Sequence, residues 1–233
     1  MSTAQTLPER SALAWQVLRL SVPAIAEQFV FGLIQMFTLM LVGRLGKQEI
    51  AVVGIANNVT WFMISAFFAF AVGATAIVAR AVGAGTPREA AEATVQATVA
   101  TVATASSVLL LGFIFAPEIL LLMGLESSAL AGAVPFLRIN LAAMLLMAVG
   151  ATLSGALRGA GDTRTPLWIN SVRGALNLLL AWLAIEAGLG LAGVAWATLL
   201  TTLLGAVAFM VAVSTSRSPV PVRWRHGYRP DMV

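Results

Sequence analysis

The sequence contains no cysteine and a single histidine, His226, near its carboxyl end. Disulfide bonds, thiolate chemistry and the usual His/Cys metal sites are therefore excluded, and we expect neither a metal nor an organic cofactor. A phosphate-binding loop and a pair of carboxylates suited to acid–base chemistry are also missing. These absences argue against an enzyme and against an ATP-driven pump.

Charged residues are scarce as well. They make up 10% of the 233 residues, while 59% are apolar, and mean hydropathy is +0.91. Soluble globular domains contain roughly 25% charged residues. The formal net charge is +4, but the 14 basic residues are scattered through apolar sequence and cannot form a basic face for nucleic acid. The composition predicts an all-α, polytopic membrane protein surrounded by lipid, with no nucleic-acid partner.

Six segments are long enough to cross a bilayer, whose core of about 30 Å needs roughly 20 helical residues. We expect a cytoplasmic or interfacial helix over 1–19, a transmembrane bundle over 20–214 and a basic cytoplasmic linker over 215–233. Links rich in glycine, proline and charge separate the spans, and two of them, GAGTP and RGAGDT, are expected to end helices rather than bind phosphate. The expected spans are about 20–43, 50–80, 93–116, 133–157, 166–186 and 190–214.

The basic residues predict the orientation. With the amino terminus in the cytoplasm, only Arg44, Lys47 and Arg138 of the 14 basic residues fall toward the outside. The opposite orientation would reverse this positive-inside bias. We therefore expect both termini to be cytoplasmic, in a protein of the cell (inner) membrane.

Glu27 is the only acidic residue well inside an expected span, and such residues are functional candidates. At about 100° per residue it shares a helix face with Gln35 and Thr38. Pro23, one turn earlier, is expected to bend the helix because it leaves a backbone carbonyl without its hydrogen bond.

Arg173 lies at a comparable depth in the fifth span, on a face that also carries Asn170 and Asn177. It either extends toward the interface or pairs with Glu27. A paired Glu27 would be a structural clamp or gate, whereas an unpaired Glu27 could carry a proton or bind a cation. Both alternatives remain open from the sequence.

Neutral polar residues occur in other spans, including Asn57 in the second and Thr198 in the sixth. In the third span, Thr94, Thr98 and Thr101 are expected to form hydrogen bonds between helices, worth about 0.6 kcal/mol on average.

Several motifs in order resemble the multidrug and toxic compound extrusion (MATE) family. They are LSVPAIAEQF, LVGRLGKQEIAVVGIANN, GATAIVARAVGAG, LRGAGDTRTPLWIN and GVAWATLL. The resemblance implies a secondary antiporter that exports organic, often cationic, compounds or drugs in exchange for H⁺ or Na⁺. It also implies two six-helix bundles. This chain resembles the amino-terminal one, so the second is expected from a missing carboxyl-terminal half or from a second chain.

The resemblance also assigns residues. Thr38 and Ala181 stand where members of the family carry aspartates, whereas Asn177 and Thr198 match positions linked to an amino-terminal cation site. Glu27 matches a glutamate found in a bacterial subset. The residues expected to line or support the cavity are Glu27, Gln35, Thr38, Asn57, Arg173, Asn177 and Thr198, with Pro23 as the bending point.

Two other functions remain open. A related lipid-linked oligosaccharide flippase should have a more cationic cavity, which Arg173 favours. A non-transporting membrane scaffold or inactive fragment is the other, because a single bundle cannot enclose a central cavity.

Overall fold

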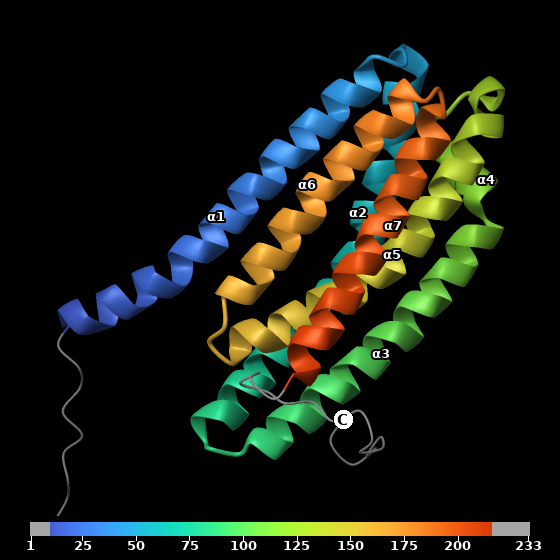
Figure 1. Cartoon of the computed structure of the whole chain (residues 1–233). Coiled ribbons are helices and arrows are strands. Elements are labelled where there is room, and N and C mark those ends of the chain that lie inside the picture. The colour runs from blue at the N-terminus through green and yellow to red at the C-terminus, as the bar shows by residue number, and fades with distance from the viewer. Residues whose placement is uncertain (1–9, 216–233) are drawn as a thin grey trace, which may run out of the picture.

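The computed structural model describes residues 10–215, and this part of the chain is helical without strands (Figure 1). The first three long helices are α1 (Arg10–Gly43), α2 (Lys47–Gly83) and α3 (Pro87–Ile114). A short helix, α4 (Ala116–Leu122), and a 3-10 turn, η1 (Ser127–Ala129), precede α5 (Leu130–Gly159). Two more long helices follow, α6 (Arg164–Glu186) and α7 (Gly190–Ser214).

Five helices in the described part of the chain are long and apolar enough to cross a membrane. The two segments of α2, Lys47–Ser65 and Phe67–Gly83, meet at an angle of 40° and make a sixth crossing when they are counted as one span. The all-α membrane bundle expected from composition is therefore confirmed. α1 is continuous from Arg10, so the structure does not separate residues 10–19 from the first span. Residues 1–9 and the linker beyond Thr215 lie outside the described residues.

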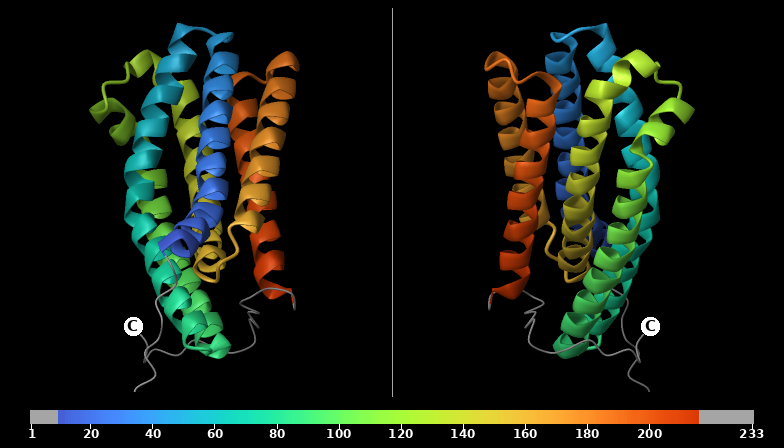
Figure 2. Two further views of the ribbon diagram at one scale, coloured as in Figure 1. Left: turned by 90° about the vertical axis from the view of Figure 1, so that its left-hand side faces the viewer. Right: turned by 90° about the vertical axis from the view of Figure 1, so that its right-hand side faces the viewer.

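The helices run up and down, so alternate links gather at opposite ends of the bundle (Figures 1 and 2). Gly85 and Gly161 end α2 and α5 with φ of 72° and 87°, a left-handed conformation that glycine adopts without steric penalty. Asp162 then accepts hydrogen bonds from the backbone N–H groups of Arg164 and Thr165 at the start of α6, at 3.1 and 3.0 Å. Both glycine-rich links therefore end helices, as the sequence predicts.

α5 lies at the centre of the bundle and packs against α2, α3 and α7. Its contact with α2 depends on small residues. A Cβ atom added at Gly155 would lie 2.6 Å from the carbonyl oxygen of Ala71, and one added at Gly159 would lie 2.5 Å from that of Thr75. The Thr75 hydroxyl donates to the Gly155 carbonyl at 3.0 Å. Without a hydrophobic driving force between helices in lipid, such close backbone packing holds them together.

Thr94, Thr98 and Thr101 of α3 are buried. The hydroxyls of Thr101 and of Thr152 on α5 form a hydrogen bond of 2.9 Å, so the expected bond between helices is confirmed for Thr101. Thr94 and Thr98 donate to carbonyls of their own helix, those of Ala90 and Thr94.

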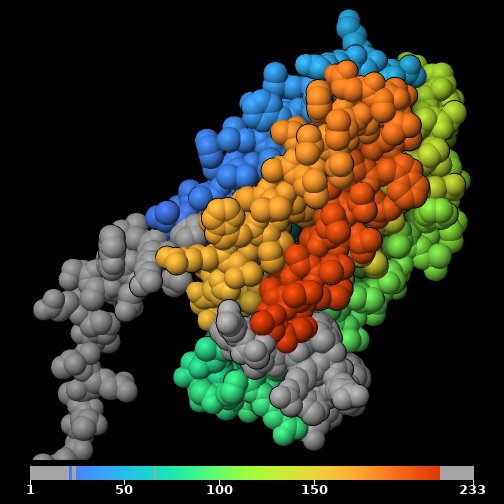
Figure 3. All heavy atoms as spheres, viewed as in Figure 1, coloured from blue at the N-terminus to red at the C-terminus, as the bar shows by residue number. Residues whose placement is uncertain are grey.

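α1 lies at the edge of the bundle, where it packs mainly on α6 and only slightly on α2. Figure 3 shows α1, α6 and α7 side by side on one face. In the most apolar stretch of α1 only 6% of residues are buried, against 50% for the corresponding stretch of α5. α1 therefore has little packing to hold it, and its polar contacts matter more.

Candidate functional site

Glu27 of α1 is held by side chains from two other helices. Both carboxylate oxygens accept hydrogen bonds of 2.8 Å from one guanidinium nitrogen, Nη2, of Arg158 at the carboxyl end of α5. Asn170 of α6 donates its Nδ2 to Oε1 of Glu27 at 2.7 Å. The Glu27 side chain is only 11% exposed and that of Arg158 is 40% exposed. Charge-assisted hydrogen bonds of this kind are among the stronger polar contacts in proteins. We call these three residues the ionic cluster.

The ion-pair partner of Glu27 differs from the one considered from the sequence. Within the described residues, Glu27 pairs with Arg158, and Arg173 forms no ion pair. Arg173 still lies near enough for its charge to interact with that of Glu27. Its side chain instead lies against α7, where a Cβ added at Gly205 would be 2.6 Å from its Cδ. The paired alternative for Glu27 is therefore the one observed, with another arginine.

A second polar group joins α6 to α7. Asn177 donates from Nδ2 to the hydroxyls of Thr198 and Thr201, each at 3.2 Å. Those hydroxyls in turn donate to the carbonyls of Val194 and Ala197 in α7. This neutral cluster therefore brings Asn177 and Thr198 together. Its hydroxyls already use their hydrogen atoms, and it contains no carboxylate.

The other residues predicted for the cavity lie elsewhere. Gln35 and Asn57 are exposed, on α1 and α2, and belong to neither cluster. The hydroxyl of Thr38 donates to the Ile34 carbonyl of its own helix at 2.8 Å. The Pro23 side chain lies outside the described residues. Although the ribbon of α1 bends in its amino-terminal part (Figure 1), the assignment of that bend to Pro23 remains a prediction.

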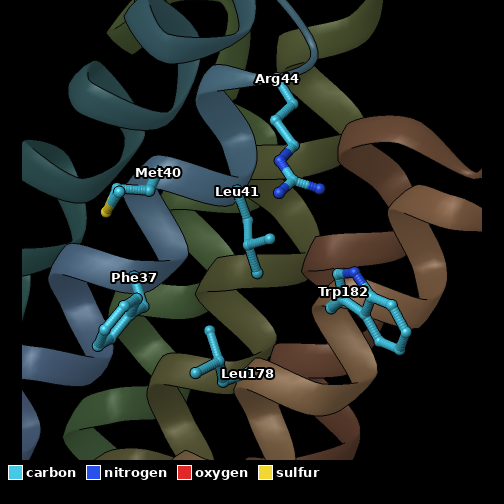
Figure 4. Close-up of a pocket in the computed structure, with 6 residues that line it drawn as sticks. All are labelled: Phe37, Met40, Leu41, Arg44, Leu178 and Trp182. Carbon is cyan, nitrogen blue, oxygen red and sulfur yellow. The ribbon is translucent and has the colours of Figure 1, made fainter.

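At the carboxyl end of α1, a pocket of about 360 Å³ lies between α1 and α6 (Figure 4). Arg44 lies at this pocket and forms an ion pair with Glu186 at the end of α6, with 3.5 Å between nitrogen and oxygen. Charged contacts therefore hold α1 near its middle and at its carboxyl end, and an apolar pocket lies next to the second contact. The pocket is lined by Phe37, Met40, Leu41, Arg44, Leu178 and Trp182.

Two residues of the clusters were missed from the sequence. Arg158 was interpreted only as a positive charge at the cytoplasmic end of a span, although it belongs to the LRGAGDTRTP motif. Thr201 lies three residues after Thr198, a spacing that places both on one helix face. Helical spacing could have identified Thr201, but nothing in the sequence identified the reach of Arg158 toward α1.

Comparison with known proteins gives a consistent picture. The model of the MatE family matches residues 23–183. The chain is similar to "Probable multidrug resistance protein NorM" of Thermotoga maritima, with 29% identity over 198 residues that cover 82% of this chain and 42% of that protein. It is also similar to "Probable multidrug resistance protein YoeA" of Bacillus subtilis, with 28% identity over 85% of this chain and 44% of that protein. The chain thus spans less than half the length of these relatives.

Solved structures share the fold. The chain superimposes with a TM-score of 0.85 on an outward-facing multidrug resistance MATE family transporter of the MOP superfamily, with 23% identity, 92% of this chain and 48% of that one covered. The same TM-score, identity and coverage relate it to a MOP superfamily transporter from Pyrococcus furiosus whose binding pocket is described as having reverse polarity.

Proposed function

The chain belongs to the MatE family, and on that premise we propose that it forms one six-helix half of a secondary antiporter that exports organic compounds in exchange for H⁺ or Na⁺. Membership of the family does not show how transport is coupled to an ion, and the ionic cluster is the observation that supports such coupling. An acidic side chain inside a membrane span is energetically unfavourable unless it is paired, and such residues typically mark ion pathways.

In this proposal the ionic cluster is a clamp that the coupling ion opens. A proton on Glu27 removes the negative charge that attracts Arg158, and Na⁺ competes with Arg158 for the carboxylate oxygens. Either ion weakens the link between α1 and α5. Since α1 packs mainly on α6, loss of this link leaves α6 as its main remaining contact and lets α1 move relative to α5.

The neutral cluster is a weaker candidate for the coupling site. Asn177, Thr198 and Thr201 already satisfy one another and the backbone of α7. A cation there would have to displace these hydrogen bonds without a carboxylate to compensate. We therefore assign coupling to Glu27 and a structural role to Asn177.

The exported compound is proposed to be organic and partly apolar. Ligand pockets are typically apolar with a few well-placed polar groups. The pocket between α1 and α6 has this character, with aromatic and aliphatic side chains next to one arginine. A second six-helix bundle, encoded further along the same reading frame or supplied by a second copy, would complete the central cavity.

Ethidium efflux from an efflux-deficient bacterial host that expresses the complete gene product tests this proposal. We expect efflux that collapses with the ion gradients and is abolished by Glu27→Gln. Glu92→Gln is the matched control because Glu92 pairs with Arg88 at the end of α3, away from the cluster. Wild-type flux in the Glu27→Gln variant would contradict the assignment of coupling to Glu27.

A lipid-linked oligosaccharide flippase is the second candidate, because Arg158 and Arg173 bring two positive charges near one carboxylate. Such a protein would leave ethidium efflux at background and restore growth of a flippase-deficient strain. A membrane scaffold would also leave ethidium efflux at background but would not restore growth.

A further inference from the structure

Arg173 is a charged side chain well inside an expected span, and it has no direct partner among the residues that the structure describes. It lies nine residues after the start of α6 at Arg164, which is about 14 Å along the helix axis. Among the described residues, no ion pair or hydrogen bond of its guanidinium is found. Arginine inside a membrane span normally pairs or lines a functional pathway. Its position therefore requires an explanation beyond packing.

The fold provides a specific place for this arginine. Gly205 of α7 is buried, and a Cβ added there would lie 2.6 Å from Cδ and 3.4 Å from Cγ of Arg173. The arginine stem therefore crosses the backbone of α7 where only glycine leaves room. One turn away on each helix, Asn177 donates to Thr201, which fixes the register of α6 against α7. The side chain is held by its stem while its five N–H donors are not used by the described protein groups.

The charges around Arg173 favour an anion. Glu27 is engaged by both Arg158 and Asn170, so its lone pairs are largely committed. The three charged groups, Glu27, Arg158 and Arg173, sum to one positive charge. In a low-dielectric interior an uncompensated positive charge attracts an anion strongly. The planar guanidinium carries a fork of parallel N–H groups, which can donate to two oxygens of a carboxylate or phosphate group at once.

We propose that Arg173, placed by Gly205, binds the carboxylate or phosphate group of an amphiphilic anion that the transporter moves. This inference rests on the proposed transport function and adds an anionic class of substrate to the organic cations that ethidium represents. The shared chemistry is an acidic oxygen group on an apolar body. Its source is either a soluble organic anion or the headgroup of an anionic lipid, and the experiment separates the two.

Two fluorescent probes with the same apolar body test the charge preference. Pyrenebutyrate is an anion, and pyrenebutyl-trimethylammonium is a cation. Binding to the complete gene product in phosphatidylcholine nanodiscs is followed by energy transfer from the protein's tryptophans to pyrene. The part of the energy-transfer signal that is lost when the phenylbutyl compound of the same charge is added in excess measures specific binding. We expect the anion to bind at least tenfold more tightly than the cation.

Variants connect that preference to the site. Arg173→Gln should remove the preference and Arg173→Lys should retain part of it, because lysine keeps the charge without the fork. Gly205→Ala should weaken it several-fold by displacing the arginine stem. Gly54→Ala is its matched control, since an added Cβ there meets nothing within 4 Å. Arg138→Gln removes an arginine that instead contacts Phe113 and should leave the preference unchanged.

The binding results identify the source of the anion and decide whether the proposal holds. Competition by phosphatidylglycerol in the nanodiscs would identify the lipid headgroup as the ligand, and its absence would identify a soluble anion. Equal binding of the two probes, or a preference that survives Arg173→Gln, overturns the proposal. Because binding is measured without transport, this result is independent of the ethidium efflux that tests the proposed function.

Discussion

α5 and α1 are held in the bundle by different forces. α5 packs mainly on three helices, half of its most apolar stretch is buried, and its glycines allow backbone contact with α2. α1 is buried over only 6% of its most apolar stretch and is joined to its neighbours by Glu27 and Arg44. Close packing does not respond to ions, whereas an ion pair does. This difference supports the proposed function, in which α5 is the fixed frame and α1 is the helix that a cation releases.

The largest effect is expected from Gly159→Ala, which tests the fixed frame. The new Cβ would lie 2.5 Å from the Thr75 carbonyl oxygen and 3.2 Å from the Thr75 Cα, and backbone atoms cannot move aside. Overpacking of this kind destabilises by roughly 1–3 kcal/mol, and we expect the upper end. The melting temperature in detergent measures it. Gly73→Ala is the control, because its Cβ meets nothing within 4 Å, and an equal loss there would contradict the packing argument.

Arg158→Gln should have the next largest effect, concentrated in α1. It leaves Glu27 with the Asn170 amide but without a cation, and an uncompensated charged group costs roughly 1–3 kcal/mol. We expect amide hydrogen exchange to accelerate by about tenfold in α1 with little change in α5. Arg88→Gln removes the exposed pair with Glu92 and should change neither helix. Equal acceleration in α1 and α5 would show that the cluster stabilises the whole bundle.

Thr101→Val should have a smaller effect on the frame. It removes the hydrogen bond of 2.9 Å to Thr152 but keeps the shape of the side chain. Hydrogen bonds between membrane helices contribute about 0.6 kcal/mol on average. Reversible unfolding in mixed micelles should detect this loss. Thr104→Val is the control, since Thr104 donates to Ala100 of its own helix, and it should unfold like the wild type.

Gly174→Ala should have the smallest effect, although its Cβ would meet Ile34 very closely. The group it meets is the terminal methyl of a flexible side chain on the loosely packed α1, which can move aside. We expect a change within about 0.5 kcal/mol, far below that of Gly159→Ala. A loss of similar size at both glycines would remove the distinction between the fixed and the movable helix.

Much of the fold could be predicted from hydropathy. The positions of the apolar segments and the glycine-rich helix ends follow from local chemistry, because a helix in lipid must satisfy its own backbone and end where glycine and charge occur. The continuity of α1 from Arg10 was not predicted. The sequence suggested a separate helix over 1–19 and a bend at Pro23, but α1 is one helix from Arg10 to Gly43.

The site was predicted in part. The family resemblance linked Asn177 with Thr198, and the structure joins them by a hydrogen bond of 3.2 Å. Glu27 was identified as the acidic residue well inside a span.

The ion-pair partner of Glu27 was not identified. Arg158 and Arg173 both lie near the level of Glu27 in the bundle, and helical periodicity does not show which of them reaches it. Gln35 and Asn57 are polar residues on apolar helices, as expected, but they are exposed and join neither cluster.

The sequence by itself determined that this protein is a bundle of apolar helices, about where those helices lie, and that one carboxylate lies well inside an expected span. Those properties depend on composition and on distance along one helix. Only the tertiary structure decided that Arg158 binds Glu27 while Arg173 lies against Gly205 with no ion-pair partner among the described residues. That choice depends on the packing of α1, α5, α6 and α7, because the reach of a long side chain is set by neighbouring helices rather than by its own.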